Sequence, residues 1–295
     1  VFQFESHGMR SLLKNLAKGG KLTFEELSAA MALFRPGPLD SGMLDDYVAI
    51  KLGASTPYYD HPNMEPALAV TGGVIIYQEQ VMQVARDLAG FTLQEADDLR
   101  KAMGKKDKVA MAAVREQWNA GCKSHSGMDE AVAGALFDKI EAFAGYGFNR
   151  SHSIEYSIIS FVSMWLKVYY PLQFYAASLE VLPEDKLLGL IEDAAKRGIS
   201  VLPPDINVSD GTFKRDASGK NLTCPFNRLK GLSDITQNAI LEARKAGPFK
   251  SKEDFIARAE KSKCNLRHHA VLHKVRAFPL IEEGQEPVHS HTPIS

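Results

Sequence analysis

Cysteine is scarce in this sequence, and its scarcity excludes two kinds of scaffold. The chain of 295 residues has only three cysteines, Cys122, Cys224 and Cys264, which are scattered and show no CxxC spacing. An odd, scattered set argues against a disulfide framework and against a zinc site. It also favours a reducing compartment, so we expect a cytoplasmic protein.

Net charge and long hydrophobic runs are lacking as well. The formal net charge is −1, so binding to nucleic acid or to a membrane surface would have to depend on local basic patches. The longest apolar run, Ser157 to Leu166, is about half as long as a membrane-spanning helix. We therefore expect no membrane partner. The chain opens with Val1 and Phe2, without a methionine or a signal peptide, which suggests a piece of something longer.

Apolar residues at helical spacing predict a mostly α fold over the first two thirds of the chain. One stripe covers residues 24–34 and must end before Pro36, because a residue that precedes proline avoids the helical conformation. The capping-box spacing of residues 92–95 predicts a helix that runs to Gly104. An apolar stripe over residues 154–169 predicts a long helix.

The character of the sequence changes after about residue 183. The segment VLPPDIN predicts an extended connector, and Gly211, Gly219 and Asn221 signal the turns of a small β hairpin. Two or three short helices are expected after it, roughly over residues 235–245, 252–260 and 266–275. We predict a multi-helical domain at 1–182, a small α-rich domain with a short β hairpin at 183–278, and a disordered tail at 279–295.

The stretch GYGFNRSHS, residues 145–153, has the features of an anion site. It directly precedes the long apolar stripe, so Ser151 or Ser153 is expected to cap a helix whose N-terminus carries unpaired N–H groups. Arg150 and His152 add hydrogen-bond donors, and His152 shares a helix face with Tyr156. The alternative is an ordinary capped turn with a solvated arginine and a surface histidine.

A second basic group lies in LRKAMGKKDK, residues 99–108, which contains five basic residues and one acidic residue. So many cations around one glycine repel each other unless an anion lies opposite, such as a polyphosphate or a nucleic-acid backbone. The alternative is that Arg100 and Lys101 lie in the last turn of a helix, where cations are favoured for stability alone.

Two further motifs involve glycine turns. In RPGP, Gly37 allows the backbone to pass close to another group, although the motif is also a simple helix terminator. In LKGLS, Gly231 precedes a helix, as in a helix-hairpin-helix motif that holds a DNA phosphate, but Ser233 stands where a second glycine is expected.

Near the end, residues 267–276 form a basic stripe. His269 and His273 have metal-ligand spacing, yet no third ligand, so a solvated face is favoured.

Several long motifs together resemble one known family. They are VFQFES, ALFRPGPLDSGM, GGVIIYQEQVMQVARDLAGFTLQEADDLRKAMGKK, FAGYGFNRSHSIEYS, WLKVYYP and VLPPDIN. In order and spacing they resemble the bacterial DNA polymerase III alpha subunits, the C-family replicative DNA polymerases. The resemblance covers residues 1 to about 278 and implies a fingers region followed by a helix-hairpin-helix region.

The resemblance implies the roles of individual residues. Arg100 and Lys101 would contact the β- and γ-phosphates of an incoming dNTP, and His152 would crowd the 2′ position of the sugar. The nucleotide-binding set implied is Arg100, Lys101, Lys105, Asn149, Arg150, Ser151, His152 and Tyr156. The DNA-binding set is Lys230, Gly231, Ser233 and Arg267.

The resemblance also implies partners and a missing part. Template-primer DNA, the remainder of the alpha subunit, and, through regions outside this chain, the sliding clamp and other holoenzyme subunits are the expected partners. In this family two Mg²⁺ ions are held by palm aspartates. No Asp-x-Asp lies in an apolar strand here, and the pairs at 45–46 and 97–98 diverge on helices. We therefore expect this chain alone to lack the palm, to hold no metal and to be inactive as a polymerase.

Several departures from the family pattern matter. Arg150 replaces a lysine and Lys101 an arginine, which keeps the charge but exchanges point-like for bidentate contact. Glu155 puts negative charge near the expected triphosphate unless it turns outward or pairs with Arg150, Ser233 lacks the conformational freedom of glycine, and Arg276 stands where a helix-ending glycine is usual. Two alternatives remain open, a non-catalytic DNA-binding or holoenzyme-interaction fragment and a helical remnant without function.

Overall fold

The computed structural model describes residues 1–105, 108–143, 146–216, 218–259 and 264–278. It divides the chain into two compact units, Val1–Val162 and Ser163–Ser295. The division lies inside one long helix, α10 (Arg150–Tyr169). The domain boundary near residue 182 stays a prediction, and the predicted tail lies outside the described residues.

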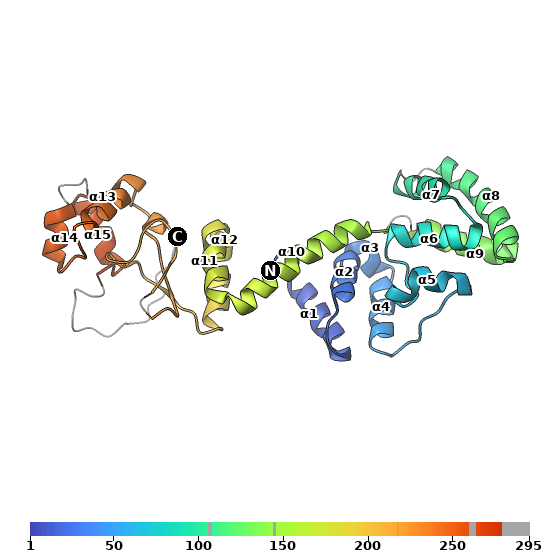
Figure 1. Ribbon diagram of the computed structural model, residues 1–295, viewed down its shortest axis with the longest axis horizontal. Helices are drawn as coiled ribbons and strands as arrows, with labels where there is room; N and C mark the ends of the chain where they lie inside the picture. Colours follow the sequence, from blue (N-terminus) through green and yellow to red (C-terminus); the bar gives the residue numbers. More distant parts are fainter. Residues whose placement is uncertain (106–107, 144–145, 217, 260–263, 279–295) are drawn as a thin grey trace. The chain divides into compact units, whose positions relative to one another are not determined.

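The first unit contains two helical clusters, each with its own core (Figure 1). The first is built on the buried side chains of Leu33 and Tyr47 and contains α1 (His7–Leu16), α2 (Phe24–Leu33), α3 (Pro36–Asp40) and α4 (Met43–Lys51). The second surrounds the buried Trp118 and contains α5 (Glu65–Leu68), α6 (Gln78–Ala89), α7 (Leu93–Lys105), α8 (Lys108–His125) and α9 (Glu130–Phe143). Three short 3₁₀ turns lie between these helices. They are η1 (Ala17–Gly19) after α1, η2 (Pro62–Met64) before α5 and η3 (Ala69–Thr71) before α6.

Local sequence signals explain several helix boundaries. Thr92 and Glu95 form the predicted capping box, with Thr92 N–H donating to Glu95 Oε2 at 2.7 Å and Glu95 N–H to Thr92 Oγ1 at 3.3 Å. A Cβ at Gly37 would lie 2.2 Å from the ring of Tyr146. This glycine therefore permits a close approach, as the RPGP motif predicts, and Pro36 also begins a short helix instead of only ending one.

The second unit confirms the predicted hairpin and adds a strand to it. Helices α11 (Pro171–Val181) and α12 (Glu184–Ala195) precede a sheet of β1 (Val201–Leu202), β2 (Lys214–Arg215) and β3 (Leu222–Thr223) in the order β1-β3-β2. The β2–β3 pair is the antiparallel hairpin, and β1 joins β3 in parallel. After η4 (Phe226–Arg228), the helices α13 (Asp234–Arg244), α14 (Lys252–Ala259) and α15 (Leu266–Lys274) enclose a core around Phe226 and Phe255. The mostly α prediction is therefore confirmed.

The predicted long helix exists, but the stripe that signalled it is not its buried face. In α10 the buried residues are Ser153, Ser157 and Ser160, whereas Ile158, Phe161 and most other large apolar side chains of the helix are exposed. Within the described residues, no helix is long and apolar enough to cross a membrane. The three cysteines are buried and unpaired.

Arg276 occupies a backbone conformation that suits glycine. It follows α15 with φ of 56°, its N–H donates to His273 O, and Ala277 N–H donates to Leu272 O. These two bonds form a Schellman motif, in which the residue after the cap is left-handed.

We expect Arg276→Gly to stabilise the second unit by about 1 kcal/mol, because glycine relieves the left-handed strain at the end of α15. Thermal and urea denaturation followed by circular dichroism would measure the change. Lys274→Gly, inside the same helix, is the control and should destabilise by about 1 kcal/mol. Equal destabilisation by both variants would contradict the strain argument.

Candidate functional site

The start of α10 is held beside the start of α6 by backbone hydrogen bonds. Gln78 N–H donates to Phe148 O at 2.9 Å and Phe148 N–H donates to Ile76 O at 3.2 Å, which makes an isolated parallel bridge between Tyr77 and Phe148. Arg35 reinforces this corner. Its guanidinium donates to Tyr146 O at 2.7 Å and lies 4.6 Å from the centre of the Phe148 ring.

Asn149, and neither of the predicted serines, caps α10. Asn149 Oδ1 accepts from His152 N–H at 2.9 Å, whereas Ser151 and Ser153 lie inside the helix. The expectation of a serine cap is therefore wrong, since the cap lies two residues before Ser151 and four before Ser153. Asparagine is as good a cap as serine, so the sequence allowed all three.

A carboxylate already occupies the N-terminus of α10. Glu79 Oε2 accepts from Arg150 N–H at 2.9 Å and Glu79 Oε1 accepts from Asn149 Nδ2 at 2.8 Å. The sequence did not point to Glu79, because the only feature seen there was its i, i+4 spacing to Gln83. In the structure the Gln83 side chain instead donates to both carboxylate oxygens of Asp87.

Arg150 lies between an acid and an aromatic ring. Its Nη2 is 3.3 Å from Glu25 Oε2, and its guanidinium carbon is 5.7 Å from the centre of the Tyr77 ring. Its Nε is buried and has no hydrogen-bond partner among the described residues. Glu155 is exposed, so of the two possibilities for this acid the structure favours the outward one.

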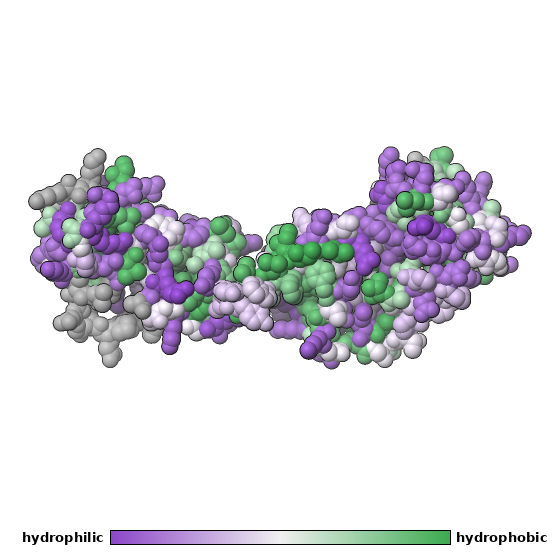
Figure 2. All heavy atoms as spheres, viewed as in Figure 1, coloured by the Kyte–Doolittle hydropathy of each residue, from purple (hydrophilic) through white to green (hydrophobic). Residues whose placement is uncertain are grey.

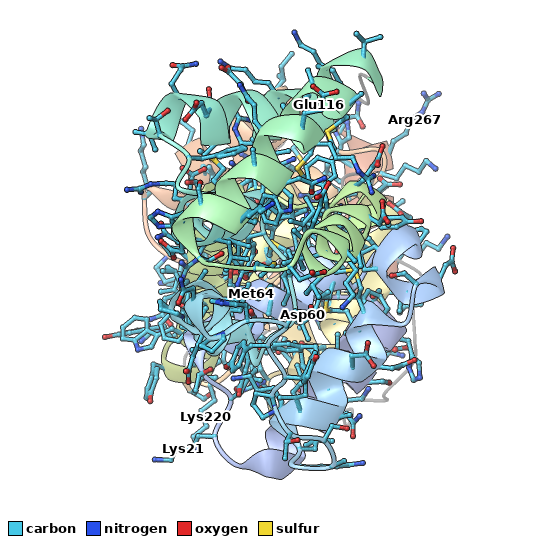
Figure 3. All side chains as sticks on the ribbon, turned by 90° about the vertical axis from the view of Figure 1, so that its right-hand side faces the viewer. Lys21, Asp60, Met64, Glu116, Lys220 and Arg267 are labelled. Carbon is cyan, nitrogen blue, oxygen red and sulfur yellow. The ribbon has the colours of Figure 1, made fainter. Side chains whose placement is uncertain are left out.

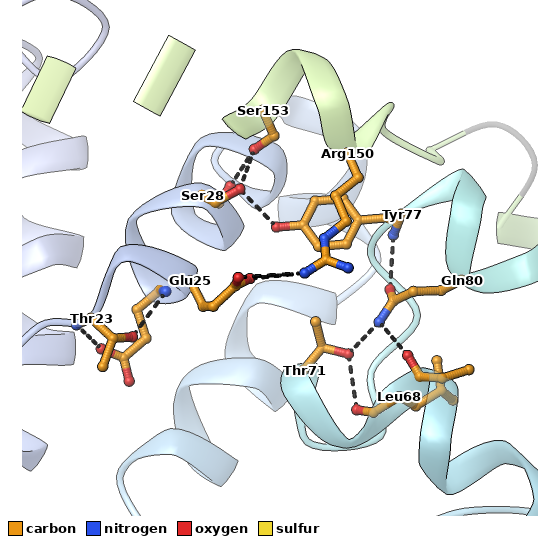
Figure 4. A network of polar contacts seen from close by, with 11 residues as sticks. Thr23, Glu25, Ser28, Leu68, Thr71, Tyr77, Gln80, Arg150 and Ser153 are labelled. Atoms are coloured by element: carbon orange, nitrogen blue, oxygen red, sulfur yellow. Dashed lines mark hydrogen bonds and ion pairs between the residues drawn. The ribbon is translucent and has the colours of Figure 1, made fainter. Parts of the chain in front are cut away.

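A buried hydroxyl network lies behind Arg150 (Figure 4). Ser28 Oγ is 3.1 Å from the Tyr77 hydroxyl and 2.9 Å from Ser153 Oγ, and Ser153 Oγ donates to Ser28 O at 2.6 Å. Burial raises the pKa of Tyr77, so its hydroxyl stays neutral. The network therefore joins α2, the segment before α6, and α10.

Aromatic rings form a row beside the start of α10, in which His152 and Phe2 are exposed and Phe148 and Tyr156 are half-buried. The His152 ring centroid lies 5.6 Å from that of Phe148 and 4.1 Å from that of Tyr156. Phe2 continues the row at 5.4 Å from Tyr156. The predicted shared face of His152 and Tyr156 is confirmed, and such a face has the geometry to stack against a planar ring.

Two of the five predicted basic residues, Arg100 and Lys101, pair with an acid of their own helix, α7. Asp97 lies 2.7 Å from Arg100 Nη2 and 2.8 Å from Lys101 Nζ. Hydrogen bonds from Lys101 and Arg100 lower the pKa of Asp97, and the bond to Asp97 raises the pKa of Lys101. Lys105 is exposed at the end of α7. Gly145, Lys106 and the side chain of Lys108 lie outside the described residues.

The two basic groups remain separate in this structure. Arg100, Lys101 and Lys105 lie together on α7, and Asn149, Arg150, Ser151, His152 and Tyr156 lie together at the start of α10. Among the described residues, no hydrogen bond or ion pair joins the two groups. Figure 1 shows α6 between α7 and the start of α10.

The glycine turn before α13 has the conformation that a hairpin needs. Gly231 has φ of 97°, whereas Ser233 has φ of −94° and caps α13 by accepting from Thr236 N–H at 3.3 Å. Position 233 therefore does not require glycine. Lys230 is exposed next to the turn.

The start of α15 lies beside this turn. His268 links the two helices, because its Nε2 is 3.3 Å from Thr236 Oγ1 and its Nδ1 accepts from Asn265 N–H at 3.1 Å. Arg267 is in the first turn of α15, and its side chain extends away from the ribbon (Figure 3). His269 is buried against Phe255, with ring centroids 5.2 Å apart, so the prediction that it belongs to a solvated stripe is wrong.

Among the described residues, no three histidine, cysteine or acidic residues lie close enough together to hold a metal ion. Of the two adjacent aspartate pairs, Asp97 is engaged by Arg100 and Lys101. Accordingly, we assign no metal-dependent step to this chain.

Comparison with family models first defines the class of protein. Residues 1–126 match the model described as the bacterial DNA polymerase III alpha subunit finger domain. Residues 198–286 match a helix-hairpin-helix motif. The chain is therefore a polymerase-type finger region followed by a helix-hairpin-helix region, in the order that the sequence motifs predicted.

Individual relatives agree with this class. The chain is 40% identical to DNA polymerase III subunit alpha of Yersinia pestis over 97% of its own length, and 44% identical to that of Pseudomonas fluorescens over 90%. It is 41% identical to the Aquifex aeolicus protein of the same name over 97% of its length. It belongs to the DNA polymerase III alpha subunit family, and it spans only 30%, 23% and 24% of these three relatives.

We expect Glu79→Ala to destabilise the first unit by about 1–2 kcal/mol, because Arg150 N–H and the Asn149 amide lose their acceptor. Glu79→Gln keeps one acceptor oxygen and should lose less. Urea denaturation followed by circular dichroism measures both variants. Glu155→Ala, which removes an exposed glutamate of the capped helix α10 itself, is the control and should change stability by less than about 0.5 kcal/mol. A Glu79→Ala variant as stable as this control would show that the carboxylate is not a helix cap.

Proposed function

We propose that this chain is the nucleotide- and DNA-contacting part of a replicative DNA-directed DNA polymerase. In this role it binds the triphosphate of an incoming dNTP and the template-primer duplex during 5′–3′ synthesis. The observation that carries the proposal is the gathering of Asn149, Arg150, His152 and Tyr156 at the start of one helix, in a chain that matches polymerase subunits over nearly its whole length.

The start of α10 supplies the groups that a triphosphate requires. Backbone N–H groups and the Arg150 guanidinium are donors for phosphate oxygens, and Glu79 and Glu25 now accept from them. In our proposal the phosphate oxygens replace these carboxylates, so that one negative partner is exchanged for another. The exchange avoids leaving a partly buried cation unpaired at any stage.

The other named residues have supporting roles in the proposal. Arg100 and Lys101 exchange Asp97 for the outer phosphates, and Lys105 adds positive charge at the end of α7. His152 and Tyr156 present their rings to the sugar and base, where His152 would exclude a 2′-hydroxyl by its bulk. Catalysis of this kind depends on positioning and charge neutralisation.

The remaining functions belong to other polypeptide. Activation of the primer 3′-hydroxyl is not assigned to this chain, because no three candidate metal ligands gather among the described residues. We propose that the aspartates for Mg²⁺ belong to the palm, in the remainder of an alpha subunit. That remainder would also contact the sliding clamp and the other holoenzyme subunits.

Removal of either phosphate-binding arginine should weaken nucleotide binding. In titrations of dATP with Mg²⁺ and primed DNA, we expect Arg150→Ala and Arg100→Ala each to lose about tenfold in affinity, or about 1.4 kcal/mol. Glu79→Gln should tighten binding, because it removes the competing charge and keeps an acceptor for α10. Arg10→Ala, an exposed arginine on α1, is the matched control. If all four variants bind dATP as the unmodified chain does, the proposed site is wrong.

A non-catalytic DNA-binding role is the second candidate, and the Gly231 turn favours it. This turn lies where the first turns of α13 and α15 meet, with Lys230 and Arg267 exposed beside it. Ser233 would present its hydroxyl and backbone to the same phosphate.

Substitution of the two basic residues at the turn should weaken duplex DNA binding without changing its sequence preference. Lys230→Ala and Arg267→Ala should each lower the slope of log affinity against log salt by about 1, as expected for one phosphate contact. Fluorescence anisotropy over a salt series gives the slope, with the exposed Lys196→Ala as control. Unchanged slopes would exclude this surface. DNA affinity that dATP does not alter would favour the second candidate over the polymerase role.

A further inference from the structure

Helix α10 exposes large apolar side chains along most of its length. The α10 apolar surface consists of Ile158, Ile159, Phe161, Val162, Trp165 and Leu166, which are 40–55% exposed. Figure 2 shows hydrophobic residues gathered along this helix. The first four of these residues lie in the first unit and the last two in the second, so the surface follows the helix itself.

The polar side of the same helix is the side that is buried. Ser153 Oγ donates to Ser28 O at 2.6 Å and Ser160 Oγ donates to Phe2 O at 2.8 Å, and Ser157 is fully buried between them. A surface helix normally buries its apolar face and exposes its polar one. In α10 this order is inverted, and its large apolar side chains remain about half exposed.

Charge is almost absent from this part of α10. After Glu155, the only charged residue of the helix is Lys167, and its Nζ lies 2.5 Å from Asp193 Oδ2. Solvated helix faces carry charged residues for solubility, whereas the exposed face of α10 between Glu155 and Lys167 carries none.

The apolar surface continues beyond α10 onto the start of the chain. Phe24, on α2, packs edge to face on Phe161 with ring centroids 6.5 Å apart, and Phe24 and Phe2 are themselves 37% and 45% exposed. A contiguous apolar area of this kind marks an interaction site more often than isolated exposed residues do. Its breadth, across two helices and an adjoining segment, suits the face of a folded domain.

We infer that the α10 apolar surface is the docking face for another domain of a longer polymerase chain. The relatives from Yersinia pestis, Pseudomonas fluorescens and Aquifex aeolicus devote only 30%, 23% and 24% of their length to the region matched here. Most of each relative is therefore polypeptide outside this region, available to cover α10 in the same molecule.

A lipid surface fits the same face less well. No helix in the described ranges is long and apolar enough to span a bilayer, and a helix that lies on a membrane needs a strongly charged opposite face. The opposite face of α10 has serines that are already bonded to Ser28 and Phe2. The inference rests on family membership and on this packing, and it does not depend on nucleotide binding.

The two tryptophans of the chain provide a matched pair for the test. Trp165 is 43% exposed and Trp118 is fully buried. Hydroxyl-radical oxidation, read for each tryptophan by mass spectrometry, would be measured on this chain alone. It would also be measured on a chimera in which this chain replaces the matched region of the Pseudomonas fluorescens relative.

In the isolated chain we expect rapid oxidation of Trp165. In the chimera it should be about fivefold slower, because a docked side chain retains only a few per cent of its exposure. Trp118 should stay protected in both and so reports folding. If Trp118 is oxidised in the chimera, the intact relative is footprinted instead, at the helix that aligns with α10.

Four results would overturn the inference. They are equal oxidation of Trp165 in the chain and the chimera, protection already in the monomeric chain, protection that rises with chain concentration, and protection that requires phosphatidylcholine–phosphatidylserine vesicles. The last three would show that the surface is covered by the chain itself, by a second copy, or by lipid. Val162→Asp provides a further check, since it should restore Trp165 oxidation in the chimera and leave Trp118 protected.

Discussion

The hydroxyl network of Ser28, Tyr77 and Ser153 is the constraint on which the first unit depends. Its bonds join residues that are 49 and 125 positions apart in the sequence. A buried hydroxyl without a partner costs about 1–3 kcal/mol, so the three side chains are strongly held together. Because Ser153 is in the first turn of α10, this network sets the rotation of the whole helix about its axis.

That rotation has two consequences. It places Arg150 over the ring of Tyr77 and within reach of Glu25, and it turns Ser157 and Ser160 inward. The apolar residues between those serines must then point outward, since neighbours on a helix are separated by about 100°. The candidate nucleotide site and the exposed apolar surface are thus two results of one buried contact.

Charge neutralisation is the second theme of the molecule. Glu25, Glu79 and Asp97 each engage a cation or a helix N-terminus that the sequence marked as a phosphate site. These internal carboxylates explain how a chain with a net charge of −1 can hold several cations in fixed positions. They also mean that any anionic ligand competes with the protein's own acids. Its measured affinity is therefore the difference between the free energy of its contacts and that of the carboxylate contacts it replaces.

Local signals in the sequence determined much of this protein. Helical periodicity identified the helices near residues 24–34 and 154–169, the Thr92–Glu95 pair marked a cap, and Gly231 and Gly37 marked a left-handed turn and a close approach. These features depend on residues a few positions apart, or on the absence of a Cβ, and can therefore be predicted without the fold. Tertiary structure alone decided which face of α10 is buried. It also brought Glu79 and Glu25, which are 71 and 125 residues away in the sequence, into contact with Arg150. Periodicity shows that a face is apolar, but only the packing of distant segments decides whether that face meets the core, another domain or water.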